Sequence, residues 1–368
     1  MAEKRSILVA LSGGVDSSVT AALLKDSGYE VVAVTLKTFC YGDFKEGPKS
    51  CCGLEGVAAA RSVASKLGIQ HFVVDVSDRF KSEVIENFTK EYSSGRTPNP
   101  CVICNATVKI PDLYDKALSL GCDSLATGHY ARIQQSPDGF GLYRGSDRAK
   151  DQSYFLWKLP RKILPNLKLP LENLTKDKVR EIAQKYCLTN ADRPESQEIC
   201  FIPDGDYVSF LKKLLPVKHK AFKSGDIIDS DGNKIGRHDG TIKFTIGQRK
   251  GIGGGNGRKL YVTGIDVDNC VVRVGEYDKL LKKTVFITDL NFLSDEPVSE
   301  TKVELMIRHR FKPISGTLKN CGNGFWRVDL DADAAAVTPG QSAVFFSTQE
   351  PDRLLGGGVI INEGSRDP

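Results

Sequence analysis

Three cysteines stand in two short segments whose residue types suit sulfur chemistry. Cys101 and Cys104 form a C-x-x-C pair within GRTPNPCVICN at residues 95–105, and Cys200 lies in SQEICFI at residues 196–202. The chain has 10 cysteines in 368 residues and no secretory leader pattern, so a disulfide framework is not expected. A thiolate can act as a nucleophile, carry sulfur as a persulfide or bind a metal. The pattern therefore predicts catalytic or metal-binding thiols. We expect Cys104 at the start of the next helix, where the helix dipole lowers the pKa of a thiol.

A second chemical segment, LSGGVDSS at residues 11–18, follows a short apolar run and precedes a helical pattern. Gly13 and Gly14 allow the backbone to approach a ligand closely, and the amides at the start of the next helix form an anion site. The serines add hydroxyl donors, and Asp16 could hold a magnesium ion beside phosphates. The segment lacks the GK[ST] element of a Walker A loop and the GxGxxG dinucleotide fingerprint. It therefore predicts a phosphate-binding loop of another type.

The string SGGVDSS resembles the PP-loop of the ATP pyrophosphatases. The resemblance implies cleavage of ATP between its α and β phosphates, activation of a carbonyl oxygen as an adenylate, and release of pyrophosphate. The superfamily includes GMP synthetases, argininosuccinate synthetases and tRNA thiolases. The loop alone does not choose among them.

The elements that must position these segments alternate between strand and helix. This βαβα order predicts a doubly wound parallel sheet with helices on both faces, in which ligands bind beyond the carboxyl ends of the strands. The apolar patterns place strands at 6–11, 30–36, 71–76 and 123–127, and helices at 17–25, 54–67, 79–92, 176–187 and 207–215.

Changes in composition divide the chain into three predicted domains. Residues 1–205 form an α/β domain, residues 206–280 a small β-rich domain and residues 281–368 a C-terminal β-barrel. A resemblance to the tRNA thiolases of the PP-loop superfamily implies that the first domain is catalytic and that the second contacts tRNA. Residues 206–320 carry 21 Lys and Arg against 14 Asp and Glu, a mild excess that suits a polyanionic partner. The overall composition, 40% hydrophobic and 26% charged, excludes a disordered or collagen-like chain.

Further motifs choose within the superfamily. They are TGHYAR at 127–132, KDQSYFL at 150–156, GQRKGIG at 247–253 and PGQSAVFF at 339–346. With the cysteine segments, they make the chain similar to the bacterial tRNA-specific 2-thiouridylases, the MnmA family, along nearly its whole length. The resemblance implies adenylation of O2 of the wobble uridine in tRNA anticodons. Sulfur then replaces that oxygen, giving 2-thiouridine, AMP and pyrophosphate.

The resemblance also implies roles for the matching positions. Cys104 is then the nucleophile, Cys200 carries the persulfide, and Cys101 is the third catalytic position. The implied ATP site consists of Ala10, Leu11, Ser12, Gly13, Gly14, Val15, Asp16, Ser17, Leu36 and Gly128. The implied contacts with the target base and the tRNA are Asn99, Pro100, Cys101, His129, Lys150, Asp151, Gln152, Arg308, His309 and Gln341.

One departure from the family bears on the mechanism. Many members carry aspartate where this chain has Cys101, and a thiol is a much weaker acid than a carboxyl group. The substitution produces three cysteines, Cys101, Cys104 and Cys200, that could bind an iron–sulfur cluster as in related thiolases. Persulfide chemistry at Cys200 with a transient disulfide to Cys104 is the other reading, and both stay open at this point. A zinc site is disfavoured because no further Cys or His pair completes four ligands.

Two other functions compete with tRNA thiolation. One is a PP-loop amidotransferase or ligase acting on a small metabolite, and the other is an RNA-binding protein with a decayed ATPase. The expected partners are the tRNA anticodon arm and a sulfur donor, which is a cysteine desulfurase, a relay protein or free sulfide. No apolar run reaches the ~18–20 residues that span a bilayer, so we expect a cytoplasmic protein with no membrane partner. The pattern leaves the role of Cys51 and Cys52 open between redox chemistry and a plain helix start.

Overall fold

A parallel sheet forms the base of the N-terminal domain in the computed structural model. The structure describes residues 5–38, 54–136, 138–191, 199–252, 259–297, 300–350 and 352–363. Within these residues the sheet has five strands in the order β3-β2-β1-β4-β7, all parallel. The strands are β1 (Ser6–Ala10), β2 (Glu30–Lys37), β3 (Gln70–Asp75), β4 (Ser124–Ala126) and β7 (Leu167–Lys168).

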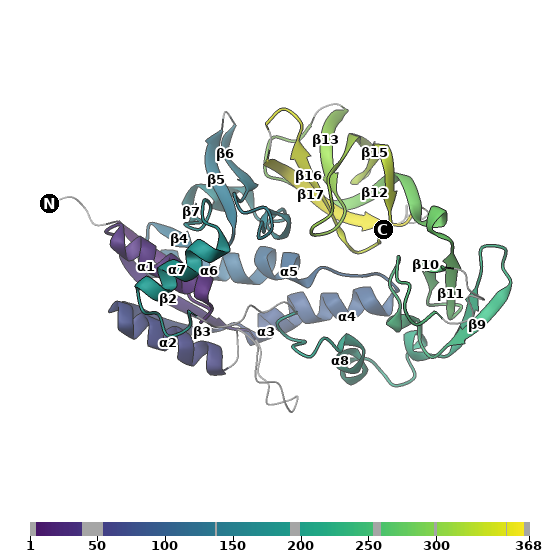
Figure 1. Ribbon diagram of the computed structural model, residues 1–368, viewed down its shortest axis with the longest axis horizontal. Helices are drawn as coiled ribbons and strands as arrows, with labels where there is room; N and C mark the ends of the chain where they lie inside the picture. The colour runs from purple at the N-terminus through teal and green to yellow at the C-terminus, as the bar shows by residue number, and fades with distance from the viewer. Residues whose placement is uncertain are drawn as a thin grey trace.

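Helices cover both faces of this sheet because its central strands carry consecutive apolar residues, which point alternately to the two faces (Figure 1). In β1, Ile7 and Val9 pack into one core with α1 (Val15–Asp26), α2 (Leu54–Leu67) and α7 (Lys176–Lys185). Leu8 faces the other core, which contains the helical segments of residues 77–93 and 100–119. The predicted doubly wound arrangement is confirmed, and the predicted helix over 54–67 has these bounds.

Two long helical segments on the second face each contain a π-helical turn. The first runs through α3 (Ser77–Phe80), η2 (Lys81–Ile85) and α4 (Glu86–Ser93). The second runs through α5 (Pro100–Ile103), η3 (Cys104–Lys109) and α6 (Ile110–Ser119). Pro111 lies in the first turn of α6 and would clash with a carbonyl one α-turn earlier, so the wider turn of η3 accommodates it. Such turns are frequent at functional sites.

The remaining described residues form two β-rich domains, as predicted. The middle domain, which follows α8 (Tyr207–Leu214), is a sheet in the order β10-β11-β8-β9, made of β8 (Gly225–Ile228), β9 (Lys234–His238), β10 (Tyr261–Asp266) and β11 (Val271–Gly275). The barrel has the order β12-β15-β14-β13-β16-β17 and is closed by pairing of β12 with β17. Its strands are β12 (Leu281–Phe292), β13 (Thr301–Met306), β14 (Ile314–Gly322), β15 (Phe325–Ala335), β16 (Ser342–Ser347) and β17 (Arg353–Ile361).

The barrel sheet extends into the catalytic domain. The hairpin of β5 (Ala131–Ser136) and β6 (Gly139–Arg144) begins directly after the TGHY segment, and β6 pairs with β17. Short 3-10 turns connect the larger elements, at η4 (Ser153–Phe155), η5 (Arg161–Asn166), η6 (Lys220–Phe222), η7 (Thr241–Lys243) and η8 (Tyr277–Leu280). No helix in the described part of the chain is both long and apolar enough to span a bilayer.

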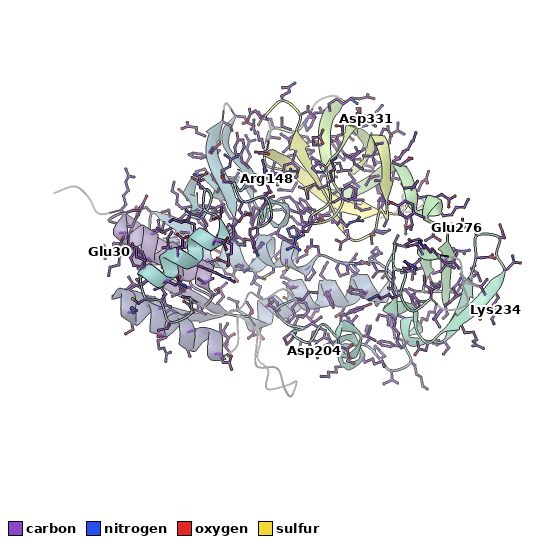
Figure 2. All side chains as sticks on the ribbon, in the orientation of Figure 1. Glu30, Arg148, Asp204, Lys234, Glu276 and Asp331 are labelled. Atoms are coloured by element: carbon purple, nitrogen blue, oxygen red, sulfur yellow. The ribbon has the colours of Figure 1, made fainter. Side chains whose placement is uncertain are left out.

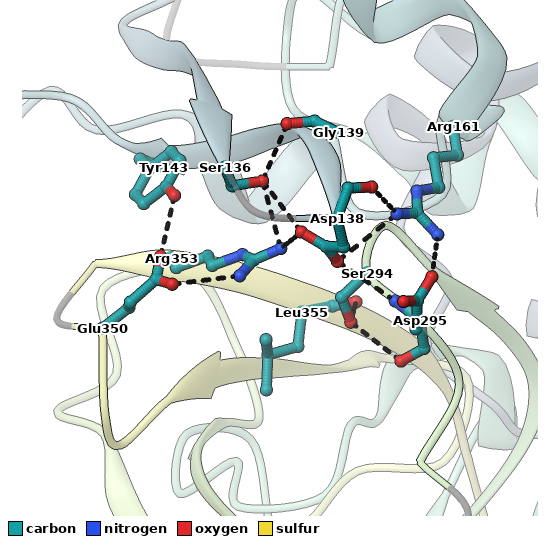
Figure 3. Close-up of polar contacts among 10 residues, drawn as sticks. All are labelled: Ser136, Asp138, Gly139, Tyr143, Arg161, Ser294, Asp295, Glu350, Arg353 and Leu355. Carbon is teal, nitrogen blue, oxygen red and sulfur yellow. Dashed lines mark hydrogen bonds and ion pairs between the residues drawn. The ribbon is translucent and has the colours of Figure 1, made fainter.

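A network of ion pairs fixes the barrel to this hairpin (Figure 3). The buried guanidinium of Arg353 in β17 pairs with Asp138 at the hairpin turn, and at 3.2 Å with Glu350. Arg161 joins Asp138 at 3.3 Å to Asp295 at 2.7 Å. The hairpin follows the TGHY segment directly in the chain. This network therefore helps to set the position of the barrel relative to the catalytic domain.

Replacing Arg353 by alanine should therefore destabilise the junction by about 2 kcal/mol, because Asp138 loses this charged hydrogen bond while it keeps Ser136 and the longer contact with Arg161. The measurement is the free energy of unfolding in urea. Lys302→Ala is the matched control, since Lys302 and Asp331 pair on the surface with more than half of each side chain exposed. We expect that control to change stability by less than about 1 kcal/mol.

The same network predicts a dependence of stability on pH. Burial alone would raise the pKa of Asp138, but hydrogen bonds from Ser136 and Arg353 and the charge of Arg353 lower it from 3.8 to about 2. A carboxyl with a lowered pKa stabilises the fold above its unfolded pKa, and the contribution is lost as the pH falls through the folded value. The wild type should therefore lose this contribution between about pH 4 and pH 2. The Arg353→Ala variant should lose less over that range.

Candidate nucleotide and thiol site

The glycine loop follows β1, the strand at which the order of strands in the sheet reverses. Strand β1 pairs with β2 on one side and with β4 on the other, so the loops after β1 and β4 meet at the carboxyl edge of the sheet. This topological switch point is where open α/β sheets bind ligands. A Cβ on Gly128, in the loop after β4, would lie 3.0 Å from the carbonyl carbon of Asp16 and from the amide nitrogen of Ser17. Gly128 therefore lies against the glycine loop, in a contact that leaves little room for a side chain, and its role in the ATP site stays a prediction.

The loop itself is held open for an anion. Gly13 has a φ of +80°, and a Cβ there would lie 2.3 Å from the carbonyl oxygen of Gly56. The hydroxyl of Ser17 accepts from the amide of Ser12 at 3.2 Å and donates to the carbonyl of Gly14 at 3.0 Å. Helix α1 begins after Gly14 without a side-chain cap, which leaves its first-turn amides for a ligand.

Asp16 is bound by two residues that the sequence patterns did not single out. Both of its carboxylate oxygens lie near the ammonium nitrogen of Lys176, at 2.7 and 2.9 Å, and the hydroxyl of Tyr130 donates to Oδ1 at 2.7 Å. Lys176 is buried at the start of α7. Asp16 can bind magnesium only by sharing or leaving this ion pair, so its predicted magnesium role stays a prediction.

Cys101 and Cys104 lie on the helix that follows the TPNP segment. Asn99 caps this helix by accepting from the amide of Val102 at 3.4 Å, and Pro100 is its first residue. We expected Cys104 at the helix start, where the dipole lowers a thiol pKa, and this position was wrong. Cys101 occupies the first turn, whereas Cys104 is buried and begins η3.

The thiol of Cys101 is open to solvent but surrounded by protein. Desolvation in this surrounding raises its pKa, and the charge of Lys109 opposes the rise. Because the shift is upward, Cys101 is a neutral thiol near pH 7.

His129 lies in the same electrostatic surroundings. Desolvation, with a smaller contribution from Lys109, lowers its pKa to about 3, so the imidazole is neutral near pH 7. Its Nδ1 is 2.8 Å from the hydroxyl of Thr127. Lys109, the last residue of η3, was not singled out by the sequence patterns. Its charge lowers the pKa of His129 and opposes the rise in the pKa of Cys101, so Lys109 lies near both residues.

Cys200 is half-buried beside an aromatic cluster. The ring of Phe201 contacts those of Phe80, Phe88 and Phe210 at centroid distances of 5.7, 5.3 and 5.4 Å. The same apolar core contains Cys104 and packs against Cys200. Rigid aromatic packing of the neighbouring residue thus fixes the backbone that carries Cys200.

The cysteine set forms no site for a single metal ion. Among the described residues, which include Cys101, Cys104 and Cys200, no three His, Cys, Asp or Glu side chains lie close enough to hold one. The iron–sulfur cluster therefore stays a prediction beside the persulfide relay. Cys51 and Cys52 lie outside the described residues.

Several residues expected to touch tRNA form hydrogen bonds between motifs that are far apart in the sequence. The amide of Gln341 donates to the carbonyls of Thr97 at 2.9 Å and Pro98 at 3.0 Å. Gln152 accepts from the amide of Tyr130 at 3.1 Å. In the same way Asp151 accepts from the amides of Gly145 and Ser153, and His309 Nε2 lies 3.2 Å from the carbonyl of Asp151. The structure therefore brings four separate motifs together, and their tRNA contacts stay predictions.

A basic groove lies where the segment after β6 meets the barrel. It has a volume of about 830 Å³ and is lined by the cations Arg144, Arg148, Lys150, Arg310 and Lys312. The Cζ atom of Arg144 lies 3.8 Å from the centroid of the Phe346 ring. Figure 2 shows Arg148 beside this junction. Of these cations, only Lys150 is among the implied tRNA contacts. The sequence did not group it with the others, because the two segments meet only in the folded protein.

Comparisons with known proteins agree along the chain. Family models match residues 5–204 ("tRNA methyl transferase HUP domain"), 209–276 ("tRNA methyl transferase PRC-barrel domain") and 282–360 ("Aminomethyltransferase beta-barrel domain"). The chain is 44% identical to the tRNA-specific 2-thiouridylase MnmA of Carboxydothermus hydrogenoformans, over 97% of this chain and 98% of that protein. It is 43% identical to the protein of that name from Rhodospirillum rubrum, over 96% of this chain and 95% of that protein. Among solved structures, the NMN synthetase of Francisella tularensis is 17% identical with a TM-score of 0.36, covering 59% of this chain and 81% of that chain.

Proposed function

The chain belongs to the MnmA family of tRNA-specific 2-thiouridylases, and we propose that it converts the wobble uridine of tRNA anticodons into 2-thiouridine using ATP. The observation that carries the proposal is the contact between two loops. The PP-loop packs directly on the TGHY loop, because Gly128 lies against the backbone of Asp16 and Ser17. The charge of Lys109, in the helical turn that begins at Cys104, acts on both Cys101 and His129. These observations support an ATP-activating loop close to the cysteine segment.

Adenylation is the first chemical step of the proposal. Uridine O2 is a poor leaving group, and its attack on the α-phosphate of ATP converts it into an AMP ester while pyrophosphate departs. The amides at the start of α1 and the hydroxyls of Ser12 and Ser17 stabilise the charge that develops on the phosphates. Magnesium bound with ATP supplies further neutralisation of that charge. Tyr130 and Lys176 orient Asp16 in the first turn of α1.

Sulfur transfer is the second step. A donor, either a cysteine desulfurase, a relay protein or free sulfide with an oxidant, places a sulfur atom on Cys200 as a persulfide. Attack of Cys104 on the inner sulfur forms a Cys104–Cys200 disulfide and releases hydrosulfide, which displaces AMP from C2 of the uridine. A cellular thiol then reduces the disulfide. Both substrates are found in the cytoplasm, which is the location we propose.

The test of this function uses purified protein, a tRNA transcript, ATP and a sulfide source. AMP, pyrophosphate and 2-thiouridine should form together, and only when tRNA is present. ADP as the product would contradict the PP-loop assignment, and AMP without tRNA would point to a small-metabolite ligase. Methylated uridine, formed without ATP when a methyl donor is added to the same mixture, would favour the transfer named in the family models over thiolation.

The basic groove should bind the tRNA backbone. Replacing Arg310 and Lys312 together by alanine removes two groove cations and should raise the Kd for tRNA about tenfold at 0.1 M salt. The slope of log K against log salt should fall by about 2, because each phosphate contact contributes about 0.9. Lys302→Ala, an exposed lysine paired with Asp331, is the control for charge alone. Equal slopes of log K against log salt for the double variant and the wild type would show that the groove does not bind tRNA.

A further inference from the structure

We propose that Asn190 is a positioning residue of the ATP-binding loop that acts through Gly13 and Ser18. Its Nδ2 donates to the carbonyl oxygen of Gly13 at 2.8 Å and to the hydroxyl of Ser18 at 2.9 Å. Asn190 is 5% exposed, so these contacts lie beneath the loop and away from solvent. The inference rests on the proposed function, because it takes residues 11–18 as the site of the ATP phosphates.

In such a loop, the direction of the Gly13 carbonyl oxygen must be fixed. A loop that binds phosphate must direct amides toward the ligand, and a carbonyl oxygen pointing the same way would repel it. Because Gly13 is buried and its oxygen bonds to buried Asn190, that oxygen points into the protein. Ser18 bonds to Gly14 at 2.9 Å as well as to Asn190, so one amide group supports both residues that precede α1.

The orientation of the Asn190 amide follows from the same contacts. Its Oδ1 is buried and has no hydrogen-bond partner among the described residues. Turning the amide over would place this oxygen against the oxygen of Gly13, which is unfavourable. A buried acceptor without a donor costs stability. The fold therefore retains this cost at the base of the PP-loop, where both donated bonds fix the loop.

Helix α7 brings Asn190 to this position. Lys176 at its start binds Asp16, and Tyr186 just after its end donates to Asp26 at the far end of α1. The chain then turns back, so that Asn190 reaches the first turn of α1 from below. The segment from Lys176 to Asn190 thus holds α1 at both ends, and Asn190 belongs to none of the motifs that identify the family.

The test compares ATP and tRNA dependence in the full-length enzyme. Asn190→Ala removes both donors, so the KM for ATP should rise about tenfold while the KM for tRNA stays unchanged. Asn190→Asp should raise it further, because a carboxylate oxygen then faces the oxygen of Gly13. Asn190→Ser, which retains a shorter donor, should lie between wild type and Asn190→Ala, and it serves if the alanine variant does not fold.

Asn291 supplies the matched control. Its Nδ2 also donates to two carbonyl oxygens, those of Trp157 at 2.7 Å and Leu159 at 3.0 Å, but at the barrel junction. Asn291→Ala should lower the Tm without changing the KM for ATP. A role in stability alone would make Asn190→Ala behave in the same way, and that result would overturn the proposal.

A second measurement does not depend on thiolation activity. Magnesium and ATP should raise the Tm of the wild type, and this shift should shrink in Asn190→Ala at the same ATP concentration. An undiminished shift would overturn the role of Asn190. A wild type that binds ATP but forms no AMP with tRNA would instead contradict the proposed function and leave the positioning role measurable.

Discussion

Replacing Cys200 by serine should abolish 2-thiouridine formation while adenylation of the tRNA continues. A serine hydroxyl cannot carry a persulfide, so the enzyme loses its sulfur carrier but retains its PP-loop. Thiolation with a desulfurase as donor should fall by about 10³-fold or more, the size of effect seen when a covalent catalyst is removed. AMP release should persist at the slow rate at which water consumes the adenylate. Mass spectrometry of the tRNA nucleosides and a pyrophosphate assay measure the two steps separately.

Parallel variants separate the thiol relay from its alternative. Cys104→Ser should also stop thiolation, whereas Cys101→Ser should have a smaller effect because the raised pKa of Cys101 keeps it protonated. Cys321 is exposed on the barrel, and the Cys321→Ser variant is the control that should retain full activity. Iron and acid-labile sulfide should be far below one cluster per chain after anaerobic purification. Stoichiometric iron, lost in each of the Cys101, Cys104 and Cys200 variants, would contradict the relay and require these thiols to come together.

Replacing Gly13 by alanine should remove ATP-dependent activity. The new Cβ would lie 2.3 Å from the carbonyl oxygen of Gly56, a backbone atom that can move away only if α2 separates from the loop. The φ of +80° adds strain of about 1–2 kcal/mol for a residue with a side chain. We expect ATP affinity to fall at least about 100-fold, or about 2.8 kcal/mol, because the loop amides lose their arrangement. Equilibrium binding of ATP to the purified variant is the measurement.

Gly28 separates strain from collision. It has a φ of +83°, but a Cβ there would meet nothing within 4 Å. Gly28→Ala therefore carries the conformational strain alone, and it should lower stability by about 1 kcal/mol without changing ATP affinity. Equal ATP affinities for the Gly13 and Gly28 variants would show that the contact with Gly56 does not shape the site.

Local sequence patterns predicted most elements that surround the site. The apolar run before the glycine loop and the alternation through Glu30–Lys37 are sufficient to identify strands, because each depends on neighbouring residues. The helix over 54–67 was predicted with its observed bounds for the same reason. The pairing of the β5–β6 hairpin with β17 was not predicted, since it joins parts of the chain that are far apart.

The motifs determined the family, but not how the site is held. The string SGGVDSS and the cysteine segments identify a PP-loop thiolase because backbone approach to phosphate and thiol chemistry restrict residue type locally. Helix dipole reasoning misplaced Cys104, because the capping residue Asn99 starts the helix four residues earlier. The raised pKa of Cys101 follows from the protein around it, which no local pattern describes.

The sequence by itself thus determined the elements, the phosphate loop and the family, whereas the tertiary structure decided which side chains support the loop. Lys176 meets Asp16 across 160 residues, Asn190 meets Gly13 across 177, and Gln341 meets Thr97 across 244. Secondary structure follows from interactions a few residues apart, so a single sequence carries its pattern. A hydrogen bond between distant segments leaves no such periodicity, because it depends on how the packed layers bring the two segments together.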